Sequence, residues 1–325
     1  MLNRLGSPRV ELAEDFLARL GGACDEVALD DESCIEAGRD WWPLGLRWAT
    51  RGMVPSRAGA VARPSDAGQV SAVLSLCNSS GVPVTAMAGR SGVCGGSVPV
   101  FGGVSLDMSR ISGLSRVDDK SLVVDVAPGT YGDDLEHTLR DQHGLTMGHW
   151  PQSMSLSTVG GWVACRSAGQ YSTRYGKIED MVAGLEVALA DGRLVRTGGR
   201  APRSAVGPDL NQLFVGSEGT LGVVTEASFR VHPLPEGDRR GAWSFPGVVE
   251  GLDACRKILA RGATPAVLRL YDEKESARSF DIQEGCVLVV LDEGDPFLVD
   301  AVMQVVSSEC STAGAGVADT TLVQR

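Results

Sequence analysis

Three clusters of glycine and small polar residues interrupt the chain and constrain its fold more than any other feature. They lie at residues 88–96, 151–162 and 216–224, and the chain holds 41 glycines in all. Glycine in a loop lets the backbone approach a ligand closely, because no Cβ obstructs that approach. The first cluster lacks the Gly-Lys-Ser/Thr ending of a Walker A loop and does not fit the Rossmann pattern GxGxxG. Alone, it indicates a structural turn at least as well as a phosphate site.

The second cluster concentrates hydroxyl groups ahead of two glycines. It reads Pro-Gln-Ser-Met-Ser-Leu-Ser-Thr-Val-Gly-Gly-Trp from residue 151. We expect a helix over 162–168, with Ser157 or Thr158 as its cap, a structural role that is compatible with a ligand site. Because helix N-termini favour anions, a diphosphate could lie between this end and the first cluster. The third cluster enters a strand and would offer backbone amides and carbonyls to a planar ring or a ribose.

Short strands and helices alternate around these clusters. A helix over 10–20 would stop at Gly21 and Gly22, and a second helix, capped by Ser65 or Asp66, would end at Gly81. A third helix ends near Gly144. The expected strands are 60–62, 82–87, 103–108, 122–126, 185–190, 194–197 and 223–231. The pair 185–190 and 194–197 flanks an Asp-Gly hairpin turn.

Pro233 and Pro235 mark the boundary of the middle domain, so the expected domains are 1–54, 55–235 and 236–325. The last domain alternates strands and helices. Its strands are expected at 242–245, 266–271 and 287–291, and its helices at 248–261 and 297–307. This order could begin a ferredoxin-like α+β sheet, and we expect the chain to end before a second half closes it.

Composition excludes several classes of protein. The formal net charge of -11 argues against binding along a nucleic-acid backbone. No apolar run approaches the length of a membrane span, and the acidic residues Glu11, Glu14 and Asp15 argue against a signal or transit peptide. The eight cysteines form no CxxC pair and only four histidines accompany them. We therefore expect no metal site, and buried thiols in a reducing cytoplasm.

In this order and at this spacing, the three clusters resemble the FAD-binding domain of the vanillyl-alcohol oxidase and p-cresol methylhydroxylase superfamily. Within it the sequence is most similar to alkyldihydroxyacetonephosphate synthase and bacterial FAD-linked oxidases. The likeness covers about 54–272 and is most specific over 148–226. It implies an α+β fold: a two-subdomain FAD-binding domain of the PCMH type, followed by the first part of a ferredoxin-like FAD-linked oxidase C-terminal (cap) domain. The motifs that carry it are Gly-His-Trp-Pro at 148–151, Gln152–Thr158, Val-Gly-Gly-Trp at 159–162, Arg166, Tyr-Gly-Lys-Ile-Glu-Asp at 175–180, Gly-Pro-Asp at 207–209 and Gly-Ser-Glu-Gly-Thr-Leu-Gly at 216–222.

The resemblance assigns cofactor contacts to four segments. The diphosphate would be held by Ala86, Met87, Ala88, Gly89, Arg90, Ser91 and Gly92. The flavin and the diphosphate would be lined by Gln152, Ser153, Met154, Ser155, Leu156, Ser157 and Thr158, together with Gly160 and Gly161. Further cofactor contacts would come from Cys165, Arg166, Ser167 and Ala168. The adenine and ribose would be held by Glu218, Gly219, Thr220, Leu221, Gly222, Val223 and Val224.

The first of these segments departs from the family, which more often shows a glycine run followed by Thr-Ser. Arg90 stands in that run and could favour the phosphates. Relatives with covalently attached flavin often carry a histidine in this loop, and this sequence has none there. The resemblance therefore implies noncovalent FAD.

Arg269 matches an arginine that the synthase family requires near its active site. Without the family, we would interpret Arg269 as an exposed strand residue paired with Asp272. With the family, it is the candidate catalytic residue. An arginine beside the flavin could bind an anionic substrate or stabilise a reduced, anionic flavin.

The resemblance implies flavin chemistry at N5 on a small oxygenated, anionic substrate. In the synthase, N5 captures the dihydroxyacetone-phosphate carbon as an acyl group leaves, and a fatty alcohol replaces it without net oxidation. In the oxidases, N5 takes a hydride from a 2-hydroxy acid such as glycolate or D-lactate. Both place the difficult chemistry on the cofactor. A third interpretation is a flavin-binding subunit without activity, and a cofactor-free structural protein is the remote one.

The family's catalytic tyrosine and histidine cluster lie in a later part of the substrate domain than this chain reaches. No histidine follows His232 and the chain ends at Arg325. We weigh a truncated product, a partner chain that supplies the rest, and an inactive remnant. The expected partners are a small-molecule or lipid-derived substrate, with a homodimer and a peripheral membrane contact left open, and no nucleic acid.

Overall fold

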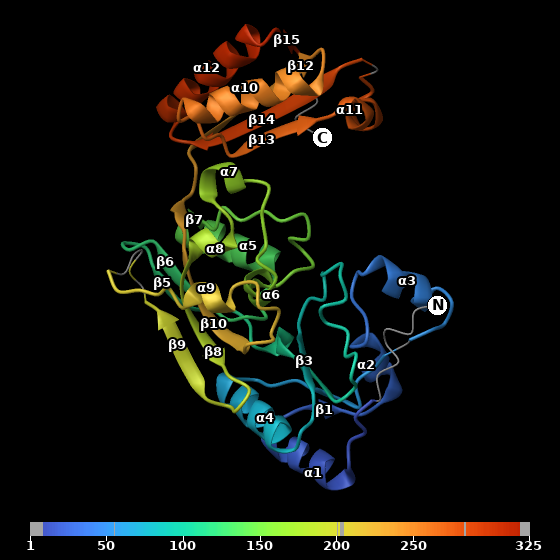
Figure 1. The fold of residues 1–325 in the computed structure, drawn as a ribbon. Coiled ribbons are helices and arrows are strands. Elements are labelled where there is room, and N and C mark those ends of the chain that lie inside the picture. The colour runs from blue at the N-terminus through green and yellow to red at the C-terminus, as the bar shows by residue number, and fades with distance from the viewer. Residues whose placement is uncertain (1–8, 55, 200, 202–204, 283, 319–325) are drawn as a thin grey trace. The chain divides into compact units, whose positions relative to one another are not determined.

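The computed structural model describes residues 9–54, 56–199, 201, 205–282 and 284–318. Within these ranges, no helix combines the length and the hydropathy that a membrane crossing requires. The chain divides into two compact units (Figure 1). The N-terminal unit comprises residues 1–147, 151–167 and 178–232. The C-terminal unit comprises residues 148–150, 168–177 and 233–325, so two short segments of the middle of the chain belong to it.

The N-terminal unit begins with a small sheet and its covering helices. Their bounds are α1 Glu14–Ala23, β1 Val27–Ala28, α2 Asp31–Glu36, α3 Pro43–Ala49, β2 Ala60–Ala62, α4 Ala67–Ser79, β3 Val84–Met87, β4 Val104–Asp107 and the 3-10 helix η1 Met108–Arg110. The strand order is β1-β2-β4-β3, and β2, β4 and β3 run parallel. Asp66 accepts a hydrogen bond from the backbone N–H of Gln69 and so caps α4, as predicted. Leu20 and Val73 are fully buried between α1, α4 and the sheet.

A larger antiparallel sheet follows in the same unit. Its order is β5-β6-β10-β8-β9, with bounds β5 Leu114–Asp118, β6 Val123–Val126, β8 Val182–Ala188, β9 Leu194–Gly198 and β10 Val223–Arg230. The helices and short strands beside it are α5 Gly132–His143, β7 Leu145–Thr146, α6 Val159–Ala164, α8 Ile178–Met181, α9 Asn211–Phe214 and β11 His232–Pro233. β8 and β9 form the expected hairpin around Asp191 and Gly192. Ala188 and Val223 join the hydrophobic core that α1 and α4 cover, so one core links the two sheets.

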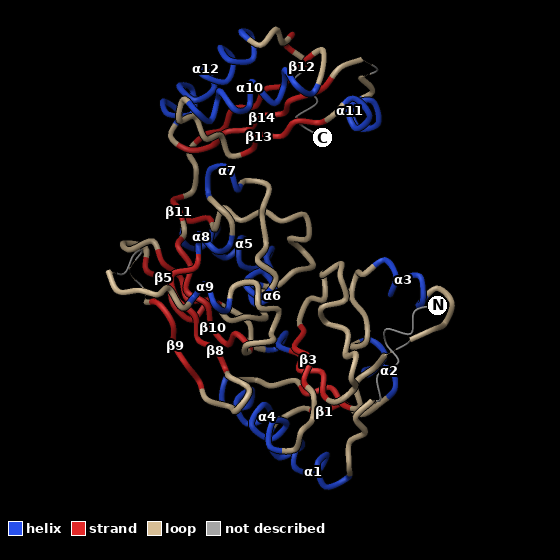
Figure 2. Tube along the Cα trace, viewed as in Figure 1, coloured by secondary structure: helices blue, strands red, loops and turns tan. Residues whose placement is uncertain are grey.

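The C-terminal unit is a sheet with two helices packed on it (Figure 2). Its elements are α7 Ser172–Tyr175, β12 Gly237–Phe245, α10 Val248–Ala260, β13 Val267–Tyr271, α11 Glu273–Phe280, β14 Cys286–Gly294, α12 Pro296–Thr312 and β15 Gly316–Val317. The strand order β13-β14-β12-β15, all antiparallel, is the β-α-β-β-α-β ferredoxin-like arrangement. Four strands of the predicted ferredoxin-like sheet thus lie within the described residues.

Two of the predicted helix bounds are wrong. Helix α1 continues through Gly21 and Gly22 to Ala23, because the burial of Phe16 and Leu20 outweighs the small helical penalty of glycine. Helix α6 spans Val159–Ala164 and not 162–168. It begins early because Gly160 packs against Pro128, and it ends early because Arg166 takes a left-handed backbone conformation with φ 53°.

Candidate cofactor site

The first glycine cluster directly follows a strand at the carboxyl edge of a parallel sheet. β3 ends at Met87, which pairs in register with Asp107 at the end of β4, and residues 88–96 follow directly. In parallel sheets, ligands bind at the carboxyl ends of the strands. The predicted first loop therefore starts where this fold favours a ligand.

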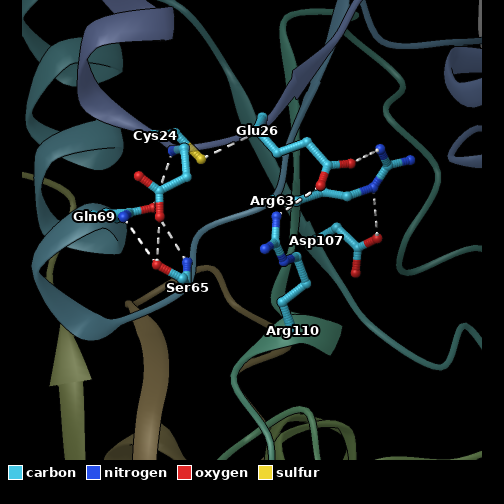
Figure 3. Close-up of polar contacts among 8 residues, drawn as sticks. Cys24, Glu26, Arg63, Ser65, Gln69, Asp107 and Arg110 are labelled. Carbon is cyan, nitrogen blue, oxygen red and sulfur yellow. Dashed lines mark hydrogen bonds and ion pairs between the residues drawn. The ribbon is translucent and has the colours of Figure 1, made fainter.

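An ion cluster fixes this edge of the sheet (Figure 3). Glu26 accepts from Arg63, just after β2, and from Arg110, in η1, each over 2.6 Å. The Arg63 Nε atom lies 3.6 Å from a carboxylate oxygen of Asp107. Three chain segments that meet at the end of the parallel strands are thereby held together. These residues were not among the predicted site residues, since nothing in the sequence connects Glu26 with Arg110.

The first and second clusters touch at Gly89. A Cβ at this position would lie 2.2 Å from the carbonyl oxygen of Leu156 and 3.4 Å from the Cα of Ser157. Real Cβ atoms do not approach backbone oxygen that closely, so the contact requires glycine here. The structure thus brings the predicted diphosphate loop directly against the predicted flavin segment.

The third cluster is hydrogen-bonded to the end of helix α6. The backbone N–H groups of Gly216 and Glu218 donate to the carbonyls of Val163 and Ala164, each over 2.9 Å. A Cβ at Gly219 would lie 3.5 Å from the Cβ of Ala86, on the strand that leads into the first cluster. All three clusters therefore meet in one place within the N-terminal unit.

Each of the three meeting segments contains one residue with strained backbone. Arg90, Arg166 and Glu218 have φ values of 52°, 53° and 50°. Left-handed conformation costs a residue other than glycine roughly 1–2 kcal/mol. Among the described residues only Leu122 and Asp281 share this conformation outside the site. Such strain gathers where a structure is held for a function, and here it supports the convergence of the loops as a site.

The second cluster is built around Trp162. Its indole N–H donates to the Ser157 hydroxyl over 2.7 Å, and that hydroxyl donates to the Ser153 carbonyl over 2.8 Å. The Ser157 hydroxyl is therefore used in these two hydrogen bonds and does not cap α6. Thr158 stands at the N-cap position, but its hydroxyl makes no cap bond.

The Thr158 hydroxyl is buried and has an unsatisfied hydrogen-bonding capacity. The residue is only 1% exposed, and no group in the described part of the chain bonds to its Oγ1 atom. A buried hydroxyl without a partner is costly, so a native site that carries one is suited to a ligand.

The side chain of Arg90 turns to Glu36. Its guanidinium donates to the Glu36 carbonyl and lies 3.6 Å from the Glu36 carboxylate. Asp40 fixes the following turn, since it accepts from the backbone N–H of Gly95 over 2.9 Å. Glu36 and Asp40 were not among the predicted site residues. Their only signal in the sequence is their position shortly before Trp41, whose backbone N–H donates to the Gly92 carbonyl over 2.9 Å.

Cys165 ends helix α6 beside the third cluster. Although part of the residue is exposed, burial raises the pKa of its thiol, and the nearby carboxylates of Glu218 and Asp40 raise it further. This direction favours the protonated thiol at neutral pH.

The structure divides the predicted site residues between the two units. Those at 86–92, 152–161, 165–167 and 218–224 lie in the N-terminal unit, whereas Ala168 and Arg269 lie in the C-terminal unit. Arg269 is exposed on β13, donates to the Gln170 side-chain carbonyl over 3.0 Å, and has its guanidinium carbon 5.1 Å from the centre of the Tyr271 ring. Asp272, the partner expected only if the family resemblance is set aside, caps α11 by accepting from the Glu275 N–H over 2.8 Å.

Comparison with known proteins identifies this arrangement. Residues 58–198 match the family model described as FAD binding domain. The chain carries an FAD binding domain. It resembles the uncharacterized FAD-linked oxidoreductase YgcU of Escherichia coli K12, with 37% identity over 243 residues, 73% of this chain and 49% of that protein. It also resembles the glycolate oxidase subunit GlcD of Bacillus subtilis 168, with 34% identity, 67% of this chain and 46% of that protein. The chain thus spans about half the length of these relatives.

Solved structures confirm the fold of the FAD binding domain and its neighbour. An alkyldihydroxyacetonephosphate synthase superposes with a TM-score of 0.84 at 26% identity, covering 96% of this chain and 62% of that one. p-Cresol methylhydroxylase superposes with a TM-score of 0.77 at 17% identity, and the match covers 95% of this chain and 67% of that one. The predicted PCMH-type fold is therefore confirmed. FAD as the predicted cofactor is confirmed by the FAD binding domain that residues 58–198 match.

The residues of the meeting loops fit an FAD molecule. At Gly89 the predicted diphosphate segment contacts the predicted flavin segment through backbone atoms, and no described side chain lies between the two. The buried Thr158 hydroxyl offers an unused hydrogen bond. Gly160 donates to the Pro128 carbonyl over 2.7 Å, which holds the start of α6 in place.

Proposed function

We propose that the chain binds FAD noncovalently where the three loops meet, and that it is an FAD-dependent oxidoreductase acting on a small oxygenated anion. The contact of Gly89 with Leu156 carries this proposal, because it joins the two segments that the family resemblance assigns to the diphosphate and the flavin. The relatives described as FAD-linked oxidoreductase and glycolate oxidase subunit support the reaction class.

The chain's own residues would hold and orient the cofactor. Residues 86–92 and 152–158 would bind the diphosphate and flavin through backbone groups and the Thr158 hydroxyl, and residues 218–224 would hold the adenine and ribose. Bound flavin supplies an acceptor for hydride or carbon at its reactive nitrogen. Arg269 would bind the negative charge of the substrate, since its guanidinium can donate two parallel hydrogen bonds to a carboxylate or phosphate.

Two kinds of reaction fit this arrangement. The structural likeness to alkyldihydroxyacetonephosphate synthase favours replacement of an acyloxy group by an alcohol on the acyl-bearing carbon of a dihydroxyacetone phosphate, without net oxidation. The likeness to GlcD favours oxidation of a 2-hydroxy acid. Anaerobic mixing separates them, because glycolate or D-lactate would bleach the flavin only in the second case. A flavin that neither a 2-hydroxy acid bleaches nor an acyl dihydroxyacetone phosphate modifies would indicate a flavin-binding subunit without activity.

The visible spectrum of the purified chain tests the cofactor. FAD recovered in the supernatant after acid precipitation, near one equivalent, would support noncovalent binding. Flavin that stays with the precipitate would refute the noncovalent attachment. A colourless protein that does not take up added FAD would refute the proposal as a whole.

A further inference from the structure

Gln170 belongs to an aromatic platform in the C-terminal unit. Its backbone N–H donates to the Trp150 carbonyl over 2.9 Å. The Trp150 and Tyr171 rings lie 5.9 Å apart, and the Tyr171 and Tyr175 rings stack at 6.4 Å. Gln170 is therefore held at its backbone between two packed aromatic residues.

A buried ion pair anchors this platform to the sheet. Arg174 Nη2 donates to the Asp292 carboxylate over 2.8 Å, and Asp292 is fully buried. Asp292 also accepts from the backbone N–H of Ala266 over 3.1 Å, at the start of β13. Tyr175 adds a hydrogen bond of 2.7 Å to the Glu293 carboxylate. The segment that carries Gln170 is thereby fixed beside the strand that carries Arg269.

The contacts of Arg269 orient its charge without neutralising it. Its Nη1 donates over 3.0 Å to Gln170, a neutral amide, and its guanidinium lies over the Tyr271 ring. In the described part of the chain no carboxylate lies within 4.0 Å of Arg269. An acidic partner would have compensated the positive charge, whereas an amide carbonyl leaves it available to an incoming anion.

We propose that Gln170 is a positioning residue that presents Arg269 to the anionic group of the substrate. This inference rests on the proposed function, in which Arg269 binds that group. Gln170 lies on an anchored platform, so the guanidinium is ordered before the substrate arrives. Pre-ordering removes part of the entropy that binding would otherwise lose. The group recognised is an oxyanion of the carboxylate or phosphate class.

Calorimetric titration of the full-length chain with oxalate and with inorganic phosphate tests the inference. Arg269→Met should abolish binding of the preferred anion. Gln170→Met keeps the side-chain volume but removes the acceptor, and should weaken binding about 3- to 10-fold, the range that ordering one long side chain corresponds to. Gln170→Glu keeps the acceptor but adds a negative charge, and should weaken binding at least as much. Gln304→Met, at an exposed position on α12, is the matched control and should change nothing.

The outcomes separate the inference from the proposed function. Binding of oxalate alone or phosphate alone identifies the anion class, and either supports the inference if Gln170→Met weakens it. Unchanged affinity in both Gln170 variants would overturn the inference, as would a wild-type chain that binds neither anion. A chain that retains no FAD would refute the proposed function. The titration of that chain still decides the role of Gln170, since both residues lie in the same unit.

Discussion

Gly89 lies so close to Leu156 that a methyl group at position 89 would reach within 2.2 Å of the Leu156 carbonyl oxygen. This contact closes the first loop onto the hydroxyl-rich second segment. It also explains why glycine is found at a position whose backbone does not otherwise demand it. The two segments could not meet in this way around any larger residue.

Gly89→Ala should therefore open the junction and release FAD. Forcing an extra methyl into a packed contact costs typically 1–3 kcal/mol, which corresponds to an affinity loss of roughly 5- to 150-fold. The FAD dissociation constant, measured by flavin fluorescence, checks this. Gly21→Ala is the control, because a Cβ at Gly21 meets nothing within 4 Å. Equal FAD affinity in the two variants would show that the junction is not part of the cofactor site.

The sequence predicted the regular elements well where their pattern was local. The α4 cap at Asp66, the α5 end at Gly144 and the hairpin at Asp191 each depend on residues a few positions apart. Helix α6 was misplaced because its start depends on Pro128, some 30 residues earlier in the chain. The short helices α2 and α3 carry no clear periodicity and were not predicted.

The sequence predicted which loops form the candidate site but not how their residues contact one another. Family resemblance placed the three clusters in order, and the structure brings them together. The family resemblance could not indicate that the Arg90 guanidinium donates to the Glu36 carbonyl, because that contact joins residues 54 positions apart. Nor could it show that Gln170, not Asp272, is the partner of Arg269, since β13 and the segment before α7 are separated by 99 positions.

Thr158→Val should have opposite effects on the two forms of the protein. Without FAD, the variant removes a buried hydroxyl that no described group satisfies, so the free energy of unfolding should rise by about 1 kcal/mol or more. With FAD, the variant lacks the hydrogen bond that we propose Thr158 donates to the cofactor, so FAD affinity should fall about 2- to 10-fold. Thermal unfolding of the FAD-free protein and FAD titration measure the two effects.

Ser105→Ala is the matched control for Thr158→Val. The Ser105 hydroxyl is also fully buried without a described partner, but it lies within β4. The control should stabilise the FAD-free protein and leave FAD affinity unchanged. If both variants weakened FAD binding alike, the Thr158 hydroxyl would have no specific role in the site.

Arg174→Met should destabilise the C-terminal unit strongly. It leaves the fully buried Asp292 carboxylate without its cation, and breaking such a pair costs typically 3–5 kcal/mol. Arg256→Met removes an exposed partner of Asp253 and should cost less than about 1 kcal/mol. Urea unfolding of both variants at pH 7 makes the comparison. Similar losses in the two would mean that the Arg174 pair does not anchor the platform.

The effect of Arg174→Met should also depend on pH. Burial already raises the pKa of Asp292 above its usual value, and Arg174 opposes that rise. Without Arg174 the pKa rises further, so folding then favours the protonated acid. A raised carboxyl pKa gives stability that is present at low pH and lost as pH increases. The destabilisation should therefore shrink between pH 7 and pH 4.5, and a constant difference would contradict it.

Two buried thiols should make the protein sensitive to alkaline conditions. Burial raises the pKa of Cys77 and of Cys310 from 9.0 to about 12. Above pH 9 the unfolded chain loses these protons while the folded chain keeps them, so stability present below pH 9 is lost as pH rises. Each thiol should lower the free energy of unfolding by roughly 1 kcal/mol between pH 8 and pH 10.

Alanine variants isolate this contribution from the other groups that titrate in the same range. Cys310→Ala should be less stable than the wild type at pH 8, because it removes a buried side chain, but this difference in the free energy of unfolding should narrow by roughly 1 kcal/mol at pH 10. Cys94→Ala removes an exposed side chain and should change the free energy of unfolding little at pH 8, which controls for the substitution itself. Urea unfolding at the two pH values provides the measurement. If the difference in the free energy of unfolding between Cys310→Ala and the wild type stays constant, this thiol ionises in the folded protein as readily as in the unfolded chain. Solvent would then reach the core beneath α12.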